Sequence, residues 1–221
     1  TFTSGKLKLM YSTMSKKGEN FTSAIEKNSK NGRKIIEMKE ISSRFTLDVT
    51  SSVSFGMEAN TLEGEHPELD DYMQEVTGEK GMSFVFIFFS MAFPKLAKFL
   101  KLRQFSKGVS DFFISVLGEN IRRREESKEV RNDFMDMLVQ LKNKGSIDGE
   151  ISTETKKLTL NECLAQGFVF MFAGTDGTAM TISFAIAELA RNQEIQERLR
   201  KEIKEAEKDG KISYEALNEM K

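Results

Sequence analysis

One stretch near the C-terminal end constrains the fold more than any other part of the sequence. From Leu164 to Ala187, Asp176 is the only ionisable side chain. Thr159 and Glu162, just before this stretch, fit a capping box, in which a threonine caps a helix and a glutamate three residues later bonds back to it. We therefore expect one helix over 160–190, about 46 Å long at a rise of 1.5 Å per residue. Its first half is apolar nearly all round, which predicts that it runs through the centre of a domain.

Small residues interrupt this helix at its middle. Two glycines there each cost about 1 kcal/mol relative to alanine, which suggests that they serve a purpose. At 100° per residue, small side chains share one flat face that permits close approach of a planar group or of another backbone: Ala173, Gly174, Gly177, Thr178 and Thr181. Asp176 lies at the flank of this face and needs a basic partner or a polar channel, since an unpaired carboxylate is costly in apolar surroundings.

Two other interpretations of this helix stay open at this point. The small residues could instead pack tightly against another helix, with threonine hydroxyls bonded to carbonyls one turn earlier. Residues 164–187 are also long enough to span a membrane once, with an interior aspartate.

The rest of the chain predicts a mainly α protein. Two prolines stand where about eleven would be average, which favours long helices. Residues 35–57 predict a core helix ended by Gly56, because apolar residues recur there at intervals of three and four: Ile35, Met38, Ile41, Phe45, Val49 and Val53. Residues 111–141 show the same spacing in two parts, separated by the charged run Arg122–Glu126, which we expect to be solvated. Residues 142–157 form the clearest loop, and a charged surface helix follows Glu188.

Residues 82–93 form a dense apolar run with five phenylalanines. The run is too short to span a bilayer as a helix, which takes about 20 residues. It predicts a buried helix ended by Pro94, with two alternatives: an aromatic roof over an apolar pocket, or a segment that dips into a membrane surface.

Composition excludes much catalytic chemistry within these residues. The chain holds one histidine, His66, in a polar stretch that predicts an exposed loop, and one cysteine, Cys163, expected to be a buried apolar residue. They cannot build a Cys/His zinc site or an internal disulfide, so no metal site is expected. The net charge of −1 offers no broad attraction to nucleic acid. The first residues show no signal peptide and look like the middle of a larger protein.

The segment Phe172–Thr178 resembles the central-helix motif of the cytochrome P450 monooxygenases, Ala/Gly-Gly-x-Asp/Glu-Thr-Thr/Ser. Its neighbours strengthen the resemblance, which covers essentially the whole chain in order and is greatest to insect microsomal, xenobiotic-metabolising members. They are the segments 2–8, 51–56, 131–138, 188–192 and 195–203.

This resemblance implies that residues 1–221 are a partial cytochrome P450 domain, its helical middle. The family's haem-ligand cysteine loop would lie downstream, outside this chain. The parent protein would insert one oxygen atom of O2 into an apolar small molecule, a xenobiotic or a lipid-like compound, using haem b (iron protoporphyrin IX). Electrons would come from NADPH through the partner NADPH-cytochrome P450 reductase. An N-terminal anchor would hold the protein at the cytoplasmic face of the endoplasmic reticulum membrane. The chain alone would be inactive.

The resemblance also implies roles for single residues. Ala173, Gly174 and Gly177 would lie against the haem, and Asp176 would be the acid of an acid–alcohol pair that conducts protons during oxygen activation. The family has the alcohol where this chain has Gly177, so Thr178 or an ordered water would replace it. Four side chains would line the substrate cavity: Phe84, Phe86, Val169 and Phe172. The alternative function is a non-catalytic helical protein that binds apolar ligands, or a single-span membrane protein.

Overall fold

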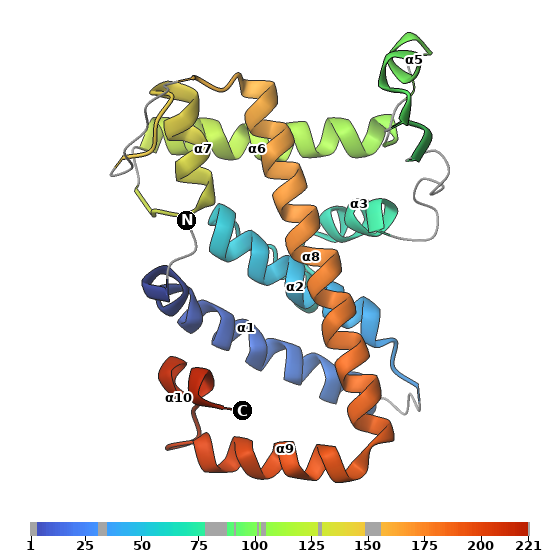
Figure 1. Cartoon of the computed structure of the whole chain (residues 1–221), viewed down its shortest axis with the longest axis vertical. Helices are drawn as coiled ribbons and strands as arrows, with labels where there is room; N and C mark the ends of the chain where they lie inside the picture. The colour runs from blue at the N-terminus through green and yellow to red at the C-terminus, as the bar shows by residue number, and fades with distance from the viewer. Residues whose placement is uncertain are drawn as a thin grey trace.

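A computed structural model describes residues 4–30, 35–77, 88–90, 92–100, 102, 105–127, 130–148 and 156–220. Helices dominate this part of the chain, and no strand occurs in it (Figure 1). The helices are α1 (Ser4–Lys30), α2 (Met38–Phe55), the 3-10 turn η1 (Thr61–Glu63), α3 (Pro67–Thr77), α5 (Pro94–Phe99), α6 (Lys107–Ser127), α7 (Phe134–Asn143), α8 (Leu160–Arg191), α9 (Gln193–Ala206) and α10 (Tyr214–Glu219). The expectation of a mainly α fold is confirmed.

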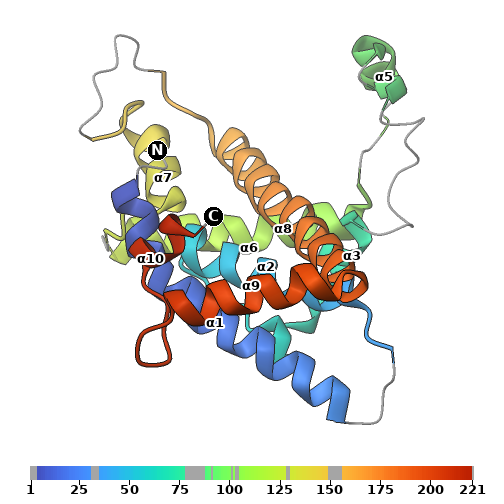
Figure 2. The ribbon, with the colours of Figure 1, turned by 60° about the horizontal axis from the view of Figure 1, so that its bottom comes forward.

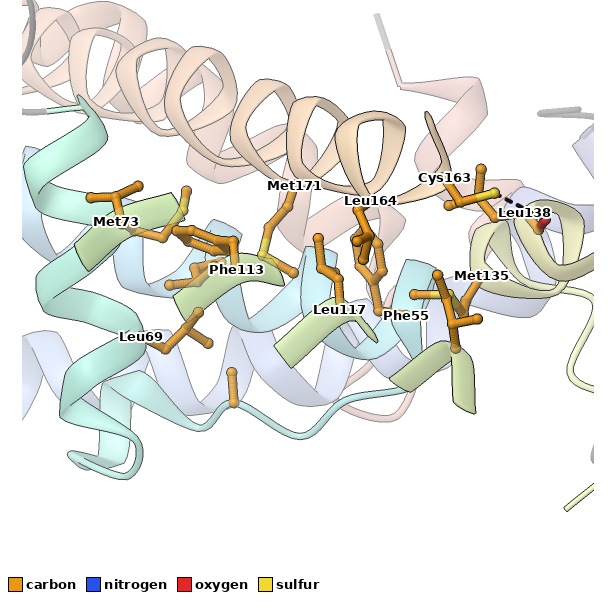
Figure 3. Packing of buried hydrophobic residues seen from close by; sticks show 14 residues of the cluster. Phe55, Leu69, Met73, Phe113, Leu117, Met135, Leu138, Cys163, Leu164 and Met171 are labelled. Carbon is orange, nitrogen blue, oxygen red and sulfur yellow. Dashed lines mark hydrogen bonds between the residues drawn. The ribbon is translucent and has the colours of Figure 1, made fainter. Parts of the chain in front are cut away.

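Helix α8 organises the molecule, and its bounds differ from the predicted ones by a single residue. It lies across α6, α3 and α2 in Figure 1, and α2 is its most extensive partner. Beneath it, apolar side chains from α2, α3, α6 and α7 form the core (Figure 3). The buried members that Figure 3 labels are Phe55, Leu69, Met73, Phe113, Leu117, Met135, Leu138, Cys163, Leu164 and Met171.

The expectation that α8 runs through the centre of a domain is wrong for the described part of the chain. One row of residues at intervals of four is buried: Cys163, Gly167, Met171, Thr175 and Ala179. On the opposite side, Val169 is 56% exposed and Phe184 is 64% exposed. Helices α2, α3, α6 and α7 cover one side of a helix that is apolar nearly all round. By length and composition α8 could also cross a membrane. Only 17% of its most apolar 18-residue segment is buried inside the protein.

Helix α2 forms as predicted, but of its predicted apolar stripe only Ile41 is fully buried. Gly56, in the left-handed conformation, ends the helix as expected, and Glu37 caps its start. The face turned inward carries mostly small polar residues, with Leu47 and Phe55: Ser42, Thr46, Thr50, Ser51 and Ser54. Phe45 from the predicted apolar stripe contacts Phe21 of α1, with ring centroids 4.8 Å apart. Ile35 precedes the helix and is 89% exposed. The apolar stripe therefore serves the contact with α1, while small residues serve the contact with α8.

The charged run on α6 contains a second departure from expectation. Arg122 and Arg123 are exposed, but Arg124 is buried. Its guanidinium Nη2 lies 2.7 Å from Asp133 Oδ2 and its Nη1 lies 3.0 Å from Asp136 Oδ1. Burial raises the pKa of the Asp133 carboxyl, while its backbone hydrogen bond and Arg124 act in the opposite direction. Arg124 thus joins α6 to the start of α7 through its two Nη atoms, while its buried Nε atom has no hydrogen-bond partner among the described residues.

The described end of the phenylalanine-rich run is not buried. Phe88 is 66% exposed and Phe93 is 55% exposed. Pro94 begins α5, at the first turn, where a proline costs no hydrogen bond. Helix α5 stands apart from the other helices in Figures 1 and 2.

Candidate functional site

The candidate site begins with the cap that fixes the start of α8. Glu162 N–H donates to Thr159 Oγ1 at 3.3 Å, and Thr159 N–H donates to Glu162 Oε2 at 2.8 Å. This pair is the predicted capping box, and its hydrogen bonds lower the pKa of the Glu162 carboxyl. The box sets the register of the helix, so each residue of the central segment presents a defined side.

The two central glycines face different surroundings. A Cβ atom built on Gly174 would lie 2.9 Å from Thr50 Oγ1, so this glycine allows α8 to lie close against α2. A Cβ atom built on Gly177 would meet no atom within 4 Å among the described residues. Gly177 therefore lies on open surface, while Gly174 borders the contact between the two helices.

The small-residue face predicted from the sequence is consequently divided. Its exposed part contains Ala173, Gly177, Thr178 and Thr181, and Gly174 is only half-buried beside Thr50. On the side of α8 that faces α2, Gly174 packs tightly against another helix, as the alternative predicts. On the other side, the small residues around Gly177 form an open surface. Both interpretations hold, each for its own side of the helix.

Threonine hydroxyls on α8 bond back along the helix, as that alternative predicts. Thr175 Oγ1 donates to Met171 O at 2.8 Å, and Thr181 Oγ1 donates to Gly177 O at 2.9 Å. Such bonds place polar hydroxyls in a helix without leaving them unsatisfied.

Asp176 lies at the flank of the open face. Its side chain is half-buried, and its Oδ1 atom is buried with no hydrogen-bond partner among the described residues. The basic partner that the sequence led us to expect is therefore not found within this part of the chain. A buried, unsatisfied carboxylate oxygen is costly, and a catalytic role or a bound water is among the reasons for which proteins keep one.

The predicted substrate-lining residues are only partly described. Val169 is 56% exposed, and Phe172 is half-buried. Phe84 and Phe86 lie outside the described residues. An apolar pocket of about 240 Å³ lies nearer the start of α8, between α8 and α6, and Phe105, Phe113 and Leu164 are among its walls.

Cys163 and His66 belong to no group of three or more potential metal ligands among the described residues. The Cys163 side chain is fully buried, and Sγ donates to Leu138 O at 3.6 Å, as the dashed line in Figure 3 shows. Burial raises the pKa of this thiol, which disfavours the thiolate that a metal would need. His66 is exposed next to Glu68. The described residues contain no cluster of three or more potential metal ligands.

Sequence reasoning missed two residues on α2 that contact the site. Thr46 Oγ1 donates to Thr175 O at 2.9 Å, and Thr50 packs against Gly174. A signal was present in the sequence, because Ser42, Thr46, Thr50 and Ser54 recur at intervals of four and form a small polar row on one side of the helix.

Comparisons with known proteins identify relatives over nearly the whole chain. The chain is 36% identical over 225 residues to cytochrome P450 6a2 of Drosophila melanogaster, covering 100% of this chain and 44% of that protein. It is 35% identical over 223 residues to cytochrome P450 6A1 of Musca domestica, covering 98% of this chain and 42% of that protein. Cytochrome P450 6k1 of Blattella germanica is 34% identical over 232 residues, covering 97% of this chain and 43% of that protein.

These relatives confirm the resemblance to insect enzymes, and the chain spans less than half of their length. The family model for cytochrome P450 matches residues 1–221, the whole of this chain. Because this match covers every residue, including the central helix with its open face beside Asp176, the chain belongs to the cytochrome P450 family.

Proposed function

We propose that this chain is the helical middle of a longer haem-thiolate monooxygenase that inserts one oxygen atom of O2 into apolar small molecules. Family membership supports the class of reaction, and the chain spans 44% of cytochrome P450 6a2 of Drosophila melanogaster. The observation that carries the proposal is the open face of α8, where Gly177 follows Asp176, whose Oδ1 atom has no hydrogen-bond partner among the described residues.

The open face fits a flat group such as haem. Ala173 and Gly177 are exposed there, and no atom of the described residues occupies the space that a Cβ on Gly177 would enter. Small residues permit a planar ring to approach the helix closely. We assign Ala173 and Gly177 to this contact, with Gly174 at its edge, where it keeps α8 close to α2.

Haem b, when bound, supplies the oxygen-activating chemistry, with a cysteine thiolate from outside this chain as its ligand. Cys163 does not serve, because its sulfur is buried in the core under α8 and lies away from the open face.

Asp176 is the residue we propose for proton delivery. Its carboxyl group can take up a proton and release it toward the open face, because its Oδ1 atom has no hydrogen-bond partner among the described residues. The residue after Asp176 is Gly177, which has no hydroxyl to pass the proton on. The exposed Thr178 hydroxyl, or a water held beside it, takes that place.

The side chains around this face favour an apolar substrate. Val169 stands one turn before Ala173 and Phe172 directly precedes it, and we assign both to the cavity together with Phe84 and Phe86. Such walls exclude water and select for apolar molecules by burial of surface. Family membership supports the remaining assignments: electrons from an NADPH-cytochrome P450 reductase, and a location at the cytoplasmic face of the endoplasmic reticulum membrane.

A non-catalytic carrier of apolar ligands is the second candidate. The pocket of about 240 Å³ between α6 and α8 favours it, because nine residues line it and most are apolar. A carrier would need neither Asp176 nor an electron donor. Formation of an oxidised product that depends on NADPH therefore distinguishes the two functions. The third candidate is a protein that crosses a membrane once through α8. The hydrogen bond from Thr46 to α8 and the burial of Thr175 argue against it, because they favour a helix packed in a protein core.

The test is oxidation of a fluorogenic alkoxycoumarin by the full-length protein with NADPH and the reductase. We expect product that depends on NADPH, and a loss of about 100-fold in Asp176→Asn, the scale of general acid–base catalysis. Glu188→Gln is the matched control, since this exposed carboxylate on the same helix pairs with Arg191. Absence of NADPH-dependent product from the wild-type protein, or equal effects of the two substitutions, would contradict the proposal.

A further inference from the structure

Helices α2 and α8 are in direct contact beside the candidate site. Thr46 is 2% exposed, and its hydroxyl oxygen lies 2.9 Å from the carbonyl oxygen of Thr175, which is 1% exposed. One turn along α2, Thr50 fills the space that a side chain on Gly174 would need. The two threonines of α2 thus touch the two residues that directly precede Asp176.

The Thr46 hydroxyl has one proton and three carbonyl oxygens within reach. Two belong to its own helix, Ser42 O at 3.0 Å and Ser43 O at 3.1 Å, and Thr175 O is the nearest. The neighbouring hydroxyls of Ser42 and Ser51 are buried without any hydrogen-bond partner among the described residues. Bonding to α8 is therefore particular to Thr46 and does not extend to the other buried hydroxyls of this face.

The carbonyl of Thr175 belongs to the peptide unit that continues into Asp176. A peptide unit is planar, so holding its oxygen also restricts the nitrogen and Cα of Asp176. On the other side of the same residue, Thr175 Oγ1 is bonded to Met171 O. Residue 175 is thus held both along α8 and from α2.

We propose that Thr46 is a positioning residue: through its hydrogen bond to the Thr175 carbonyl, it holds the Asp176 segment of α8 in the orientation that proton delivery requires. Thr46 acts through α8 and touches no reacting atom. This inference rests on the proposed function for the role of Asp176, but the restraint that it describes can be measured independently.

The first measurement is hydrogen–deuterium exchange in peptides that cover residues 172–182 of the haem-loaded full-length protein. Thr46→Val keeps the shape and removes the hydroxyl, so amide exchange should rise about fivefold, the effect of one hydrogen bond. Thr46→Ser keeps the hydroxyl and should exchange like the wild-type protein. Thr77→Val is the control, because that hydroxyl bonds only within its own helix, to Met73 O.

The second measurement is the yield of product per NADPH consumed. Thr46→Val should lower this ratio several-fold, and Thr46→Ser should restore it, while the Michaelis constant for the substrate stays unchanged. A purely structural loss would instead reduce haem content and rate together at a constant ratio. If Thr46→Val does not fold, Thr46→Ala and Thr46→Ser give the same comparison between small side chains that differ by a hydroxyl.

Equal exchange and equal yield in the hydroxyl-bearing and hydroxyl-free variants would overturn the role of Thr46. Failure of the proposed function looks different, since the wild-type protein would then form no product at all. The exchange measurement would still decide whether Thr46 restrains α8, because it does not depend on turnover.

Discussion

At the scale of single residues, neighbours decide what each side chain contributes. Gly174 and Gly177 have the same side chain on the same helix, yet one touches Thr50 and the other touches nothing within 4 Å. Lys17 is buried although lysine is a surface residue, because Glu58 and Asn60 bind its ammonium group. The consequences of substitution therefore depend on the environment at each position, which the next two predictions use.

Restoring a hydroxyl at Gly177 should improve proton delivery. Gly177→Thr has room in the structure, since a Cβ there meets no atom within 4 Å. We expect the product formed per NADPH to rise about two- to fivefold, the effect of one added hydrogen bond. The measurement is product and peroxide release from the same reaction in the full-length enzyme. An unchanged ratio in Gly177→Thr, with a reduced ratio in Thr178→Ala, would show that Thr178 already serves as the relay.

The ion pair between Lys17 and Glu58 predicts a pH-dependent stability. Hydrogen bonds from Lys17 and then Ser52 lower the pKa of Glu58 below its ordinary value of 4.5. The ionised form is therefore favoured by folding, and its contribution is present above pH 4.5 and lost as the pH falls through the lowered value. We expect Glu58→Gln to cost about 1 kcal/mol at neutral pH, allowing for solvent screening of this exposed carboxylate.

Thermal unfolding at several pH values checks this expectation. The difference between wild type and Glu58→Gln should shrink below pH 4.5. In a Lys17→Met background, Glu58→Gln should have little effect at any pH. A difference that stays constant with pH would show that the pair is not responsible.

At the scale of helices, local signals predicted the ends of α8 and distant contacts decided its surroundings. The capping box and the continuous apolar pattern lie within the helix itself, so they fixed its bounds to within one residue. The buried face of α2 could not be predicted in this way. Its apolar stripe contacts α1 through Phe45, while Thr46 and Thr50 contact α8, and only the packing of three helices determines which side is buried. Arg124 was mistaken for a surface charge for the same reason: its partners Asp133 and Asp136 lie on another helix and its cap.

The contact between α2 and α8 predicts opposite effects for two identical substitutions. Gly174→Ala puts a methyl group 2.9 Å from Thr50 Oγ1. Overpacking of this kind costs about 1–3 kcal/mol, of which the better helix propensity of alanine returns about 1 kcal/mol. Gly177→Ala, on the open face, should instead stabilise the helix by about 1 kcal/mol.

A double substitution identifies the contact responsible. Thr50→Ala removes the two nearest atoms and leaves only Thr50 Cβ, at 3.6 Å. Gly174→Ala should therefore cost less in a Thr50→Ala background than in the wild type, as measured by the unfolding temperature of the full-length protein. Additive effects of the two substitutions would mean that α8 and α2 do not meet at these residues.

At the scale of the whole molecule, the sequence was sufficient for the fold class and for the family. Scarce prolines, helical periodicity and the Phe172–Thr178 motif all agree with the helices that form. The exposure of one side of α8 could not be foreseen, because an apolar pattern does not show how much of it other segments cover. The chain spans less than half the length of its relatives, and the uncovered side of α8 carries the residues proposed for haem and substrate. We therefore propose that the reaction takes place on the side of α8 that α2, α3, α6 and α7 leave open.

The ferrous carbon-monoxide spectrum is the most direct test that this chain belongs to a haem-thiolate enzyme whose ligand is not Cys163. The full-length protein and its Cys163→Ala variant should both give the thiolate-type spectrum, because Cys163 lies in the core with its sulfur bonded to Leu138 O. The 221-residue chain mixed with haem should give no such spectrum. Loss of the thiolate-type spectrum in a folded Cys163→Ala variant, or its appearance in the 221-residue chain, would contradict the account.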